Sequence, residues 1–151
     1  MTGSLTNSEE LIKMPELEIV REQLKRHEGF KAKPYRCSAG ALTIGYGTNL
    51  DARGITREEA ERLMMNEVYD CVKALQRKLG DTYNNLNANR KAVLINMAYN
   101  MGISGLMTFK NTLRYIKQGN YEQASENMLV SQWADQVGNR AKELSEIMKI
   151  G

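Results

Sequence analysis

The feature that most constrains this 151-residue chain is a glycine-rich stretch over residues 27–47, which reads HEGFKAKPYRCSAGALTIGYG. In its second half, β-forming residues alternate with glycines at positions 40, 45 and 47. Glycine at this density is typical of tight turns and of close approach of the backbone to a ligand. Strands this short are not stable alone, so they must pack against helices. We therefore expect a small β patch within a mostly helical chain.

Helical signals lie on both sides of this patch. Before it, Pro15 suits a first helical turn and apolar residues recur at spacings of three and four, which predicts a helix over residues 15–26. After it, Thr56 and Glu59 form a capping-box pattern that predicts the start of a helix over residues 56–79. Further helical segments are expected at 87–101, 110–117, 121–129 and 132–150.

The order of these elements predicts one α+β domain, predominantly α-helical, over residues 15–151. A small β-containing lobe would occupy residues 28–55, the helix at 56–79 would link the lobes, and residues 87–150 would form a helical lobe. Residues 1–14 are expected to be an N-terminal extension that could be flexible. A chain of this length can bury about 68–70% of its unfolded surface, which is enough for a stable core.

Composition and charge exclude several classes of protein. A net charge of +3, with no basic run interleaved with aromatic residues, argues against a nucleic-acid surface. The first twenty residues contain four glutamates and no unbroken apolar run, so neither a signal peptide nor a membrane anchor is predicted. His27 is the single histidine and has no partner at ligand spacing, so no metal and no cofactor is expected. Cys37 and Cys71 are too few to form a disulfide framework, and Cys71 falls on the apolar face of the linking helix.

Glu28 comes at the end of the first predicted helix, directly before Gly29. The helix dipole is unfavourable to an anion there and would tend to hold the carboxyl protonated. A single glutamate in such a place is more often a solvated surface residue, so its role depends on the residues that surround it in the sequence.

The string Glu28–Gly29, Cys37 and Thr43–Gly47 resembles the catalytic signature of phage-type lysozymes, the endolysins of glycoside hydrolase family 24. That family usually carries Glu, Asp and Thr at this spacing, and Cys37 stands here at the position of the Asp. The later half of the chain is similar to the helical lobe of the same family, through Asn89–Met97, Met101–Gly102, Phe109, Asn111, Leu113–Arg114, Trp133 and Asn139–Ala141. The resemblance covers about residues 20–150.

The resemblance implies a two-lobed lysozyme fold that hydrolyses the β-1,4 bond between N-acetylmuramic acid and N-acetylglucosamine in peptidoglycan. Glu28 would be the general acid and Thr43 would position the attacking water. Tyr99, Asn100 and Arg140 would contact the substrate, with Arg140 also pairing with the acid. The enzyme would be a monomer that waits in the host cytoplasm, reaches the glycan strands with the help of a membrane-permeabilising partner, and acts on the cell wall.

Cys37 departs from the family pattern, and the residues leave its role open. A thiolate whose pKa is lowered by its neighbours, Arg36 among them, could act as general base or stabilise developing positive charge. The thiol could also attack the sugar covalently, or be a tolerated substitution, with Asp51 as the nearest alternative base. Two other functions stay open for the same reason. One is a lytic transglycosylase that uses Glu28 alone, and the other is a catalytically weak wall-binding module.

Overall fold

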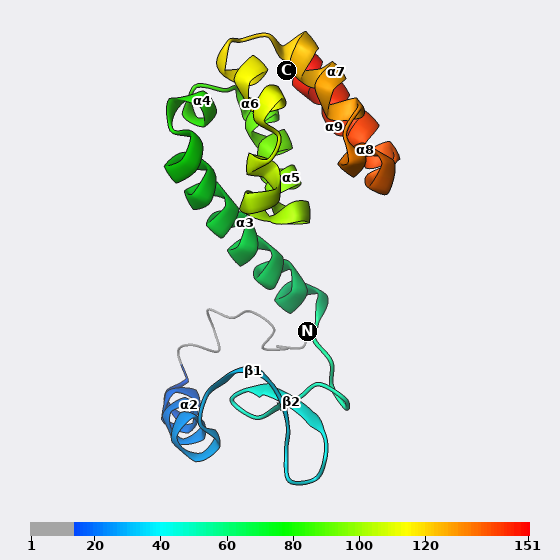
Figure 1. Cartoon of the computed structure of the whole chain (residues 1–151). Helices are drawn as coiled ribbons and strands as arrows, with labels where there is room; N and C mark the ends of the chain where they lie inside the picture. The colour runs from blue at the N-terminus through cyan, green and yellow to red at the C-terminus, as the bar shows by residue number, and fades with distance from the viewer. Residues whose placement is uncertain (1–13) are drawn as a thin grey trace, which may run out of the picture. The chain divides into compact units, whose positions relative to one another are not determined.

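The structure is a computed structural model, and it describes residues 14–151. These residues form eight helices and one three-stranded antiparallel sheet (Figure 1). In chain order the elements are α2 (Pro15–Glu28), β1 (Lys31–Arg36), β2 (Leu42–Gly45), β3 (Thr48–Asn49), α3 (Arg57–Leu79), α4 (Asp81–Asn84), α5 (Ala88–Met107), α6 (Lys110–Lys117), α7 (Tyr121–Leu129), α8 (Gln132–Val137) and α9 (Asn139–Ile150). Except for Met14, the expected N-terminal extension lies outside the described residues.

The described chain divides into two compact units, the first ending at Glu59 and the second running from Ala60 to Gly151. The first unit contains α2 and the sheet. Helix α2 begins at Pro15 as predicted and ends at Glu28, because Gly29 adopts a φ of +67° that ends the helix. Strand β1 begins at Lys31, earlier than the β-like pattern indicated. It is an edge strand whose exposed sequence KAKPYR carries no apolar alternation that could announce it.

Helix α3 begins with the predicted capping box. The backbone N–H of Thr56 donates to Glu59 Oε1 at 2.8 Å, and the backbone N–H of Glu59 donates to Thr56 Oγ1 at 3.1 Å. Arg53 also donates to the Glu59 carboxylate at 2.8 Å. The hydrogen bonds from Arg53 and Thr56 lower the pKa of Glu59 to about 2, so the box keeps its negative acceptor well into acidic solution.

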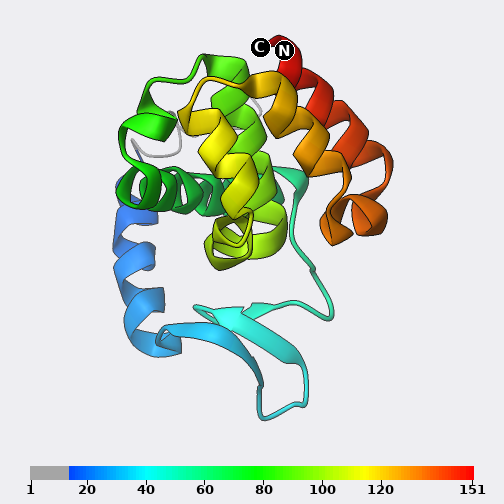
Figure 2. The ribbon, with the colours of Figure 1, turned by 45° about the horizontal axis from the view of Figure 1, so that its top comes forward.

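The hydrophobic core of the second unit is built mainly from α5, α6, α7 and α9, and Figure 2 shows α7 and α9 lying side by side. Four apolar residues of α5 are buried in it: Val93, Leu94, Met97 and Ala98. Met97, Met128 and Met148 are fully buried, and flexible methionine side chains suit the filling of a core. Cys71 of α3 is partly buried and packs against this core, in agreement with its predicted place on the apolar face of the helix.

Two glycines break the helical segments of this unit. Gly102 has a φ of +80° and kinks α5, but the helix resumes beyond it, so the predicted stop is a kink. Gly138 has a φ of +56° and separates α8 from α9 within the segment predicted at 132–150. Both are conformations that residues with a Cβ adopt only with strain.

No single helix among residues 14–151 has the length and apolarity needed to cross a membrane. Helices α5 and α6 meet that test only as a pair, across a bend of 101°. The most apolar positions of α5 are buried in the core of the second unit.

Candidate active site

Glu28 is the last residue of α2, and its carboxyl group lies against the turn between β2 and β3. The contact is with Gly47, which has a φ of +80°. A Cβ built on Gly47 would lie 2.6 Å from Glu28 Oε2 and 3.0 Å from its Cδ. A side chain at position 47 would have to displace the Glu28 carboxyl, so the glycine leaves room for it. The TIGYG segment therefore lies directly beside the candidate acid.

Cys37 and Thr43 are brought together by the tight hairpin between β1 and β2. The backbone N–H of Cys37 donates to the Ala41 carbonyl at 3.0 Å, and the N–H of Gly40 donates to the Cys37 carbonyl at 2.8 Å. Thr43 is only 4% exposed, and its hydroxyl donates to the Ala41 carbonyl at 2.9 Å. The same hydroxyl is within hydrogen-bonding reach of the Cys37 thiol. Two of the three predicted catalytic side chains are thus neighbours.

The hairpin lowers the pKa of the Cys37 thiol. The largest cause is a hydrogen bond from the backbone N–H of Ala41, followed by one from Ala39, and the side chain of Thr43 adds a smaller one. Partial burial works in the opposite direction and is outweighed. Backbone N–H groups favour the thiolate because they donate to the charged form. Residue 37 therefore occupies a position prepared for an anion.

Arg36, expected to be the cation that lowers this pKa, is not among its causes. Its guanidinium instead donates to Asp51 Oδ2 at 3.3 Å and to the Gly40 carbonyl at 3.1 Å. The same Asp51 oxygen accepts the backbone N–H of Leu42 at 2.8 Å. Asp51 thus ties the loop after β3 to the start of β2. The alternative base has a structural role in the hairpin.

Two of the three predicted substrate contacts, Tyr99 and Arg140, line the same pocket of the second unit. This pocket has a volume of about 410 Å³, and its other lining residues are Met64, Val68, Ala92, Ile95 and Asn96. Arg140 donates from Nε and Nη2 to Asn96 Oδ1, at 2.9 and 2.7 Å. The Tyr99 hydroxyl donates to the Glu67 carboxylate, and this bond raises the pKa of Tyr99. The pocket thus has an apolar lining with polar groups from Tyr99, Asn96 and Arg140.

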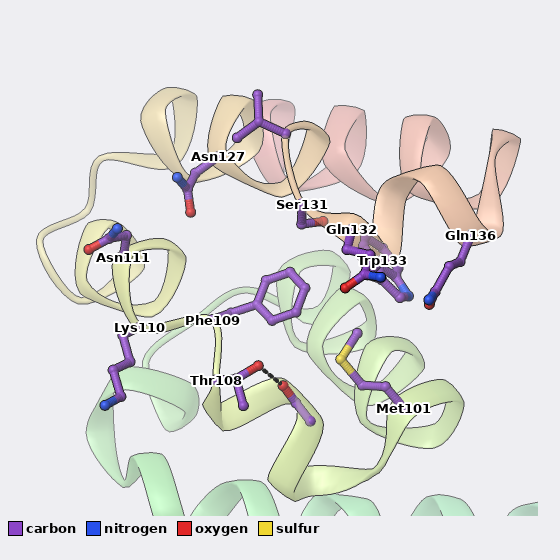
Figure 3. A pocket seen from close by; sticks show the side chains of 12 residues that line it. Met101, Thr108, Phe109, Lys110, Asn111, Asn127, Ser131, Gln132, Trp133 and Gln136 are labelled. Atoms are coloured by element: carbon purple, nitrogen blue, oxygen red, sulfur yellow. Dashed lines mark hydrogen bonds between the residues drawn. The ribbon is translucent and has the colours of Figure 1, made fainter.

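Asn100, the third predicted substrate contact, forms a hydrogen bond with Trp133. Its Oδ1 accepts the indole N–H of the buried Trp133 at 2.8 Å. Trp133 lines a second pocket of about 700 Å³, formed by residues from α5 to α8 (Figure 3). The sequence analysis did not predict this pocket, because its lining comes from several short segments and no single motif marks it.

The two cysteines are both free thiols, in opposite environments. Burial and the nearby carboxylates of Asp70 and Glu67 raise the pKa of Cys71, whereas that of Cys37 is lowered. Within residues 14–151, no three His, Cys, Asp or Glu side chains gather in a way that could hold a metal ion.

A glutamate at the end of a helix, with its carboxyl group beside a small antiparallel sheet, in a chain whose larger unit is helical, is the arrangement of a lysozyme-like α+β enzyme. The family model described as phage lysozyme matches residues 25–147, most of the chain, so the protein belongs to the phage lysozyme family. It is similar to the probable T4-type lysozyme 1 of Dictyostelium discoideum, with 26% identity over 160 aligned residues that cover 87% of this chain and 94% of the relative. An endolysin of Acyrthosiphon pisum secondary endosymbiont phage 1 is 28% identical over 109 residues, which cover 70% of this chain and 72% of that protein.

Membership of this family confirms the resemblance and the fold class that the sequence predicted. The chain is a lysozyme-type hydrolase with peptidoglycan as its substrate. The roles of its individual residues stay predictions. The contact between Glu28 and Gly47 leads to one test, and the opposite pKa shifts of the two cysteines lead to another.

The Glu28–Gly47 contact predicts that Gly47→Ala loses lytic activity, while Gly119→Ala, in the turn between α6 and α7, keeps it. Both glycines have φ near +80°, so each substitution should cost about 1–2 kcal/mol of stability. Only at position 47 does the new Cβ collide with the Glu28 carboxyl, because nothing lies within 4 Å at position 119. Displacing a catalytic group can reduce the rate by about 10²-fold. Lysis of purified walls and urea unfolding of both variants check this, and equal lysis rates would contradict it.

The opposite pKa shifts predict that iodoacetamide alkylates Cys37 faster than Cys71 near neutral pH. A lowered pKa means a larger thiolate fraction at a given pH, and the thiolate is the reacting form. The rate at Cys37 should level off at a lower pH than the rate at Cys71. Peptide mapping by mass spectrometry measures both sites in one sample. Faster alkylation of Cys71 than of Cys37 would contradict the lowered pKa of Cys37.

Proposed function

We propose that this protein is an endolysin that hydrolyses the β-1,4 bond between N-acetylmuramic acid and N-acetylglucosamine, with Glu28 as its general acid. The observation that carries this proposal is the Glu28 carboxyl held against the Gly47 backbone, in the same unit as the hairpin that joins Cys37 to Thr43. Family membership supports the substrate.

In this mechanism Glu28 gives its proton to the leaving glycosidic oxygen as the bond to the anomeric carbon breaks. A water molecule attacks the same carbon and loses a proton to the Cys37 thiolate. The backbone N–H groups of Ala39 and Ala41 support this role, because they stabilise the thiolate before the reaction begins. Glu28 thus releases one proton and Cys37 takes up one proton in each cleavage.

Thr43 would position the attacking water. Its hydroxyl has one proton, which goes to the Ala41 carbonyl or to the Cys37 sulfur, and its oxygen keeps lone pairs that can accept a hydrogen from water. Its burial at 4% exposure restricts the side chain to one place, which favours a positioning role.

We further propose that Tyr99, Asn100 and Arg140 contact the glycan. Arg140 and Tyr99 support this by lining one pocket, and Asn100 can donate from its amide NH₂ group, since the bond it makes within residues 14–151, to Trp133, uses its oxygen. We also propose that the protein is a monomer, and that a membrane-permeabilising partner lets it pass from the host cytoplasm to the cell wall.

A lytic transglycosylase is the second candidate, because a cysteine stands at the position where the family usually has its Asp. Such an enzyme needs only Glu28, since a hydroxyl of the sugar itself closes onto the anomeric carbon. Analysis of digested peptidoglycan separates the possibilities. Free reducing ends indicate a hydrolase, anhydro-muramic ends indicate a transglycosylase, and intact strands indicate a wall-binding module.

The acid assignment predicts that Glu28→Gln lowers lytic activity by about 10²–10⁴-fold, because the amide keeps the shape but has no proton to transfer. Reducing-end release from purified walls is the measurement. Glu16→Gln is the matched control, since it makes the same change in the first turn of α2 and should leave the rate unchanged. Near wild-type lysis by Glu28→Gln would overturn the assignment.

The base assignment predicts that Cys37→Ala folds normally but is severely impaired, whereas Cys37→Asp stays active. An aspartate can accept the same backbone N–H groups and is ionised far below the range of a thiol, so its activity should depend less on alkaline pH. Cys71→Ala is the control and should change stability more than rate. Activity of Cys37→Ala within a few-fold of wild type would make the thiol a bystander.

A further inference from the structure

The first unit carries a pair of aromatic rings on its surface. Phe30 follows α2, and Tyr46 lies in the turn between β2 and β3. The two ring centroids are 5.5 Å apart, and the ring planes are tilted by 50°. Phe30 is 64% exposed and Tyr46 is 45% exposed. One exposed apolar residue is ordinary in a protein, whereas apolar side chains that touch on the surface indicate a binding site.

The packing of the first unit does not account for these rings. Among residues 14–59, Thr43 is the one buried residue, so neither ring belongs to a core of this unit. Two rings left in water forgo the free energy that their burial would provide. Their contact with each other covers only part of each ring, and a ligand that covered the rest would recover that free energy.

The aromatic pair adjoins the candidate acid. Phe30 comes two residues after Glu28, and Tyr46 directly precedes Gly47, whose backbone lies against the Glu28 carboxyl group. The two rings therefore come from the two segments that meet at this carboxyl group. A substrate bound at Glu28 passes close to both of them.

Tyr46 also lines a pocket of about 570 Å³. The other residues that line this pocket are Arg21, Leu24 and Lys25. These three precede Glu28 by seven, four and three residues, which are the spacings of residues on one face of a helix. The pocket thus continues from the aromatic pair along the face of α2 that ends at the candidate acid.

The charge of this pocket is balanced by neighbouring carboxylates. Arg21 pairs with Glu18 and with Glu22, and Lys25 Nζ lies 3.7 Å from the Glu22 carboxylate. Two cations and two carboxylates give no net charge, so the pocket does not favour an anion. Arginine has five N–H donors and lysine has three, so donors remain for the neutral oxygen atoms of a ligand.

From this arrangement we infer that Phe30 and Tyr46 form a stacking platform for an uncharged sugar ring of the glycan strand, beside the bond that Glu28 cleaves. The inference rests on the proposed function, since it concerns the same substrate. A sugar ring has a face of C–H groups, which packs against aromatic rings and takes them out of water. Its hydroxyl and N-acetyl oxygen atoms accept hydrogen bonds, which the N–H groups of Arg21 and Lys25 supply.

Kinetics on purified walls test the platform. The double variant Phe30→Leu with Tyr46→Leu keeps apolar side chains but removes both rings. We expect its KM to rise about tenfold with kcat little changed, a loss of about 1.4 kcal/mol of binding. Phe30→Tyr and Tyr46→Phe keep the rings and should keep the wild-type KM. Tyr69→Leu is the matched control, because Tyr69 is 56% exposed on α3, and it should behave as wild type.

Calorimetric titration of the whole Glu28→Gln protein with soluble, uncross-linked glycan strands measures binding without cleavage. Adding the two leucine substitutions should weaken this binding about tenfold. Wild-type KM and binding in the double leucine variant would overturn the inference. A large fall in its urea unfolding midpoint would also overturn it, because the rings would then be covered by another part of the chain. Near wild-type lysis by Glu28→Gln would instead overturn the proposed function, so the two failures are distinguishable.

Discussion

The contact between the Glu28 carboxyl and the backbone of Gly47 is the constraint on which the candidate site depends. It requires a helix that ends at residue 28, a turn that admits a φ of +80°, and no Cβ at position 47. Each requirement comes from a different stretch of chain. Together they place an exposed glutamate carboxyl directly beside the turn between β2 and β3, and the glycine at position 47 follows from the same need.

The hairpin also explains how a cysteine can stand where the family usually has an aspartate. Backbone N–H groups of Ala39 and Ala41 point towards residue 37 whatever its side chain is, because the tight turn sets their direction. The backbone thus stabilises an anion, and either a carboxylate or a thiolate can supply it. Asp51 and Arg36 form hydrogen bonds that stabilise this turn. Neither lowers the pKa of Cys37, although the sequence alone suggested that Arg36 would.

Local patterns in the chain predicted most of the helical elements. Pro15, the capping box at Thr56 and the run from Lys110 to Lys117 each mark a boundary through interactions within a few residues, and the structure confirms them. The first residues of strand β1 escaped prediction because an exposed edge strand has no apolar alternation to reveal it. The helix end predicted before Gly102 was wrong, because a glycine indicates a break in a helix but not whether the helix resumes.

The sequence by itself determined the family, the candidate acid and the position of the unusual thiol, because these depend on residue types at short, fixed spacings. Only the tertiary structure decided how those residues are used. It assigned the lowered pKa of Cys37 to backbone N–H groups, placed Tyr99 and Arg140 on one pocket, and set Asn100 behind Trp133. The physical reason is that hydrogen-bond partners and burial depend on contacts between residues far apart in the chain.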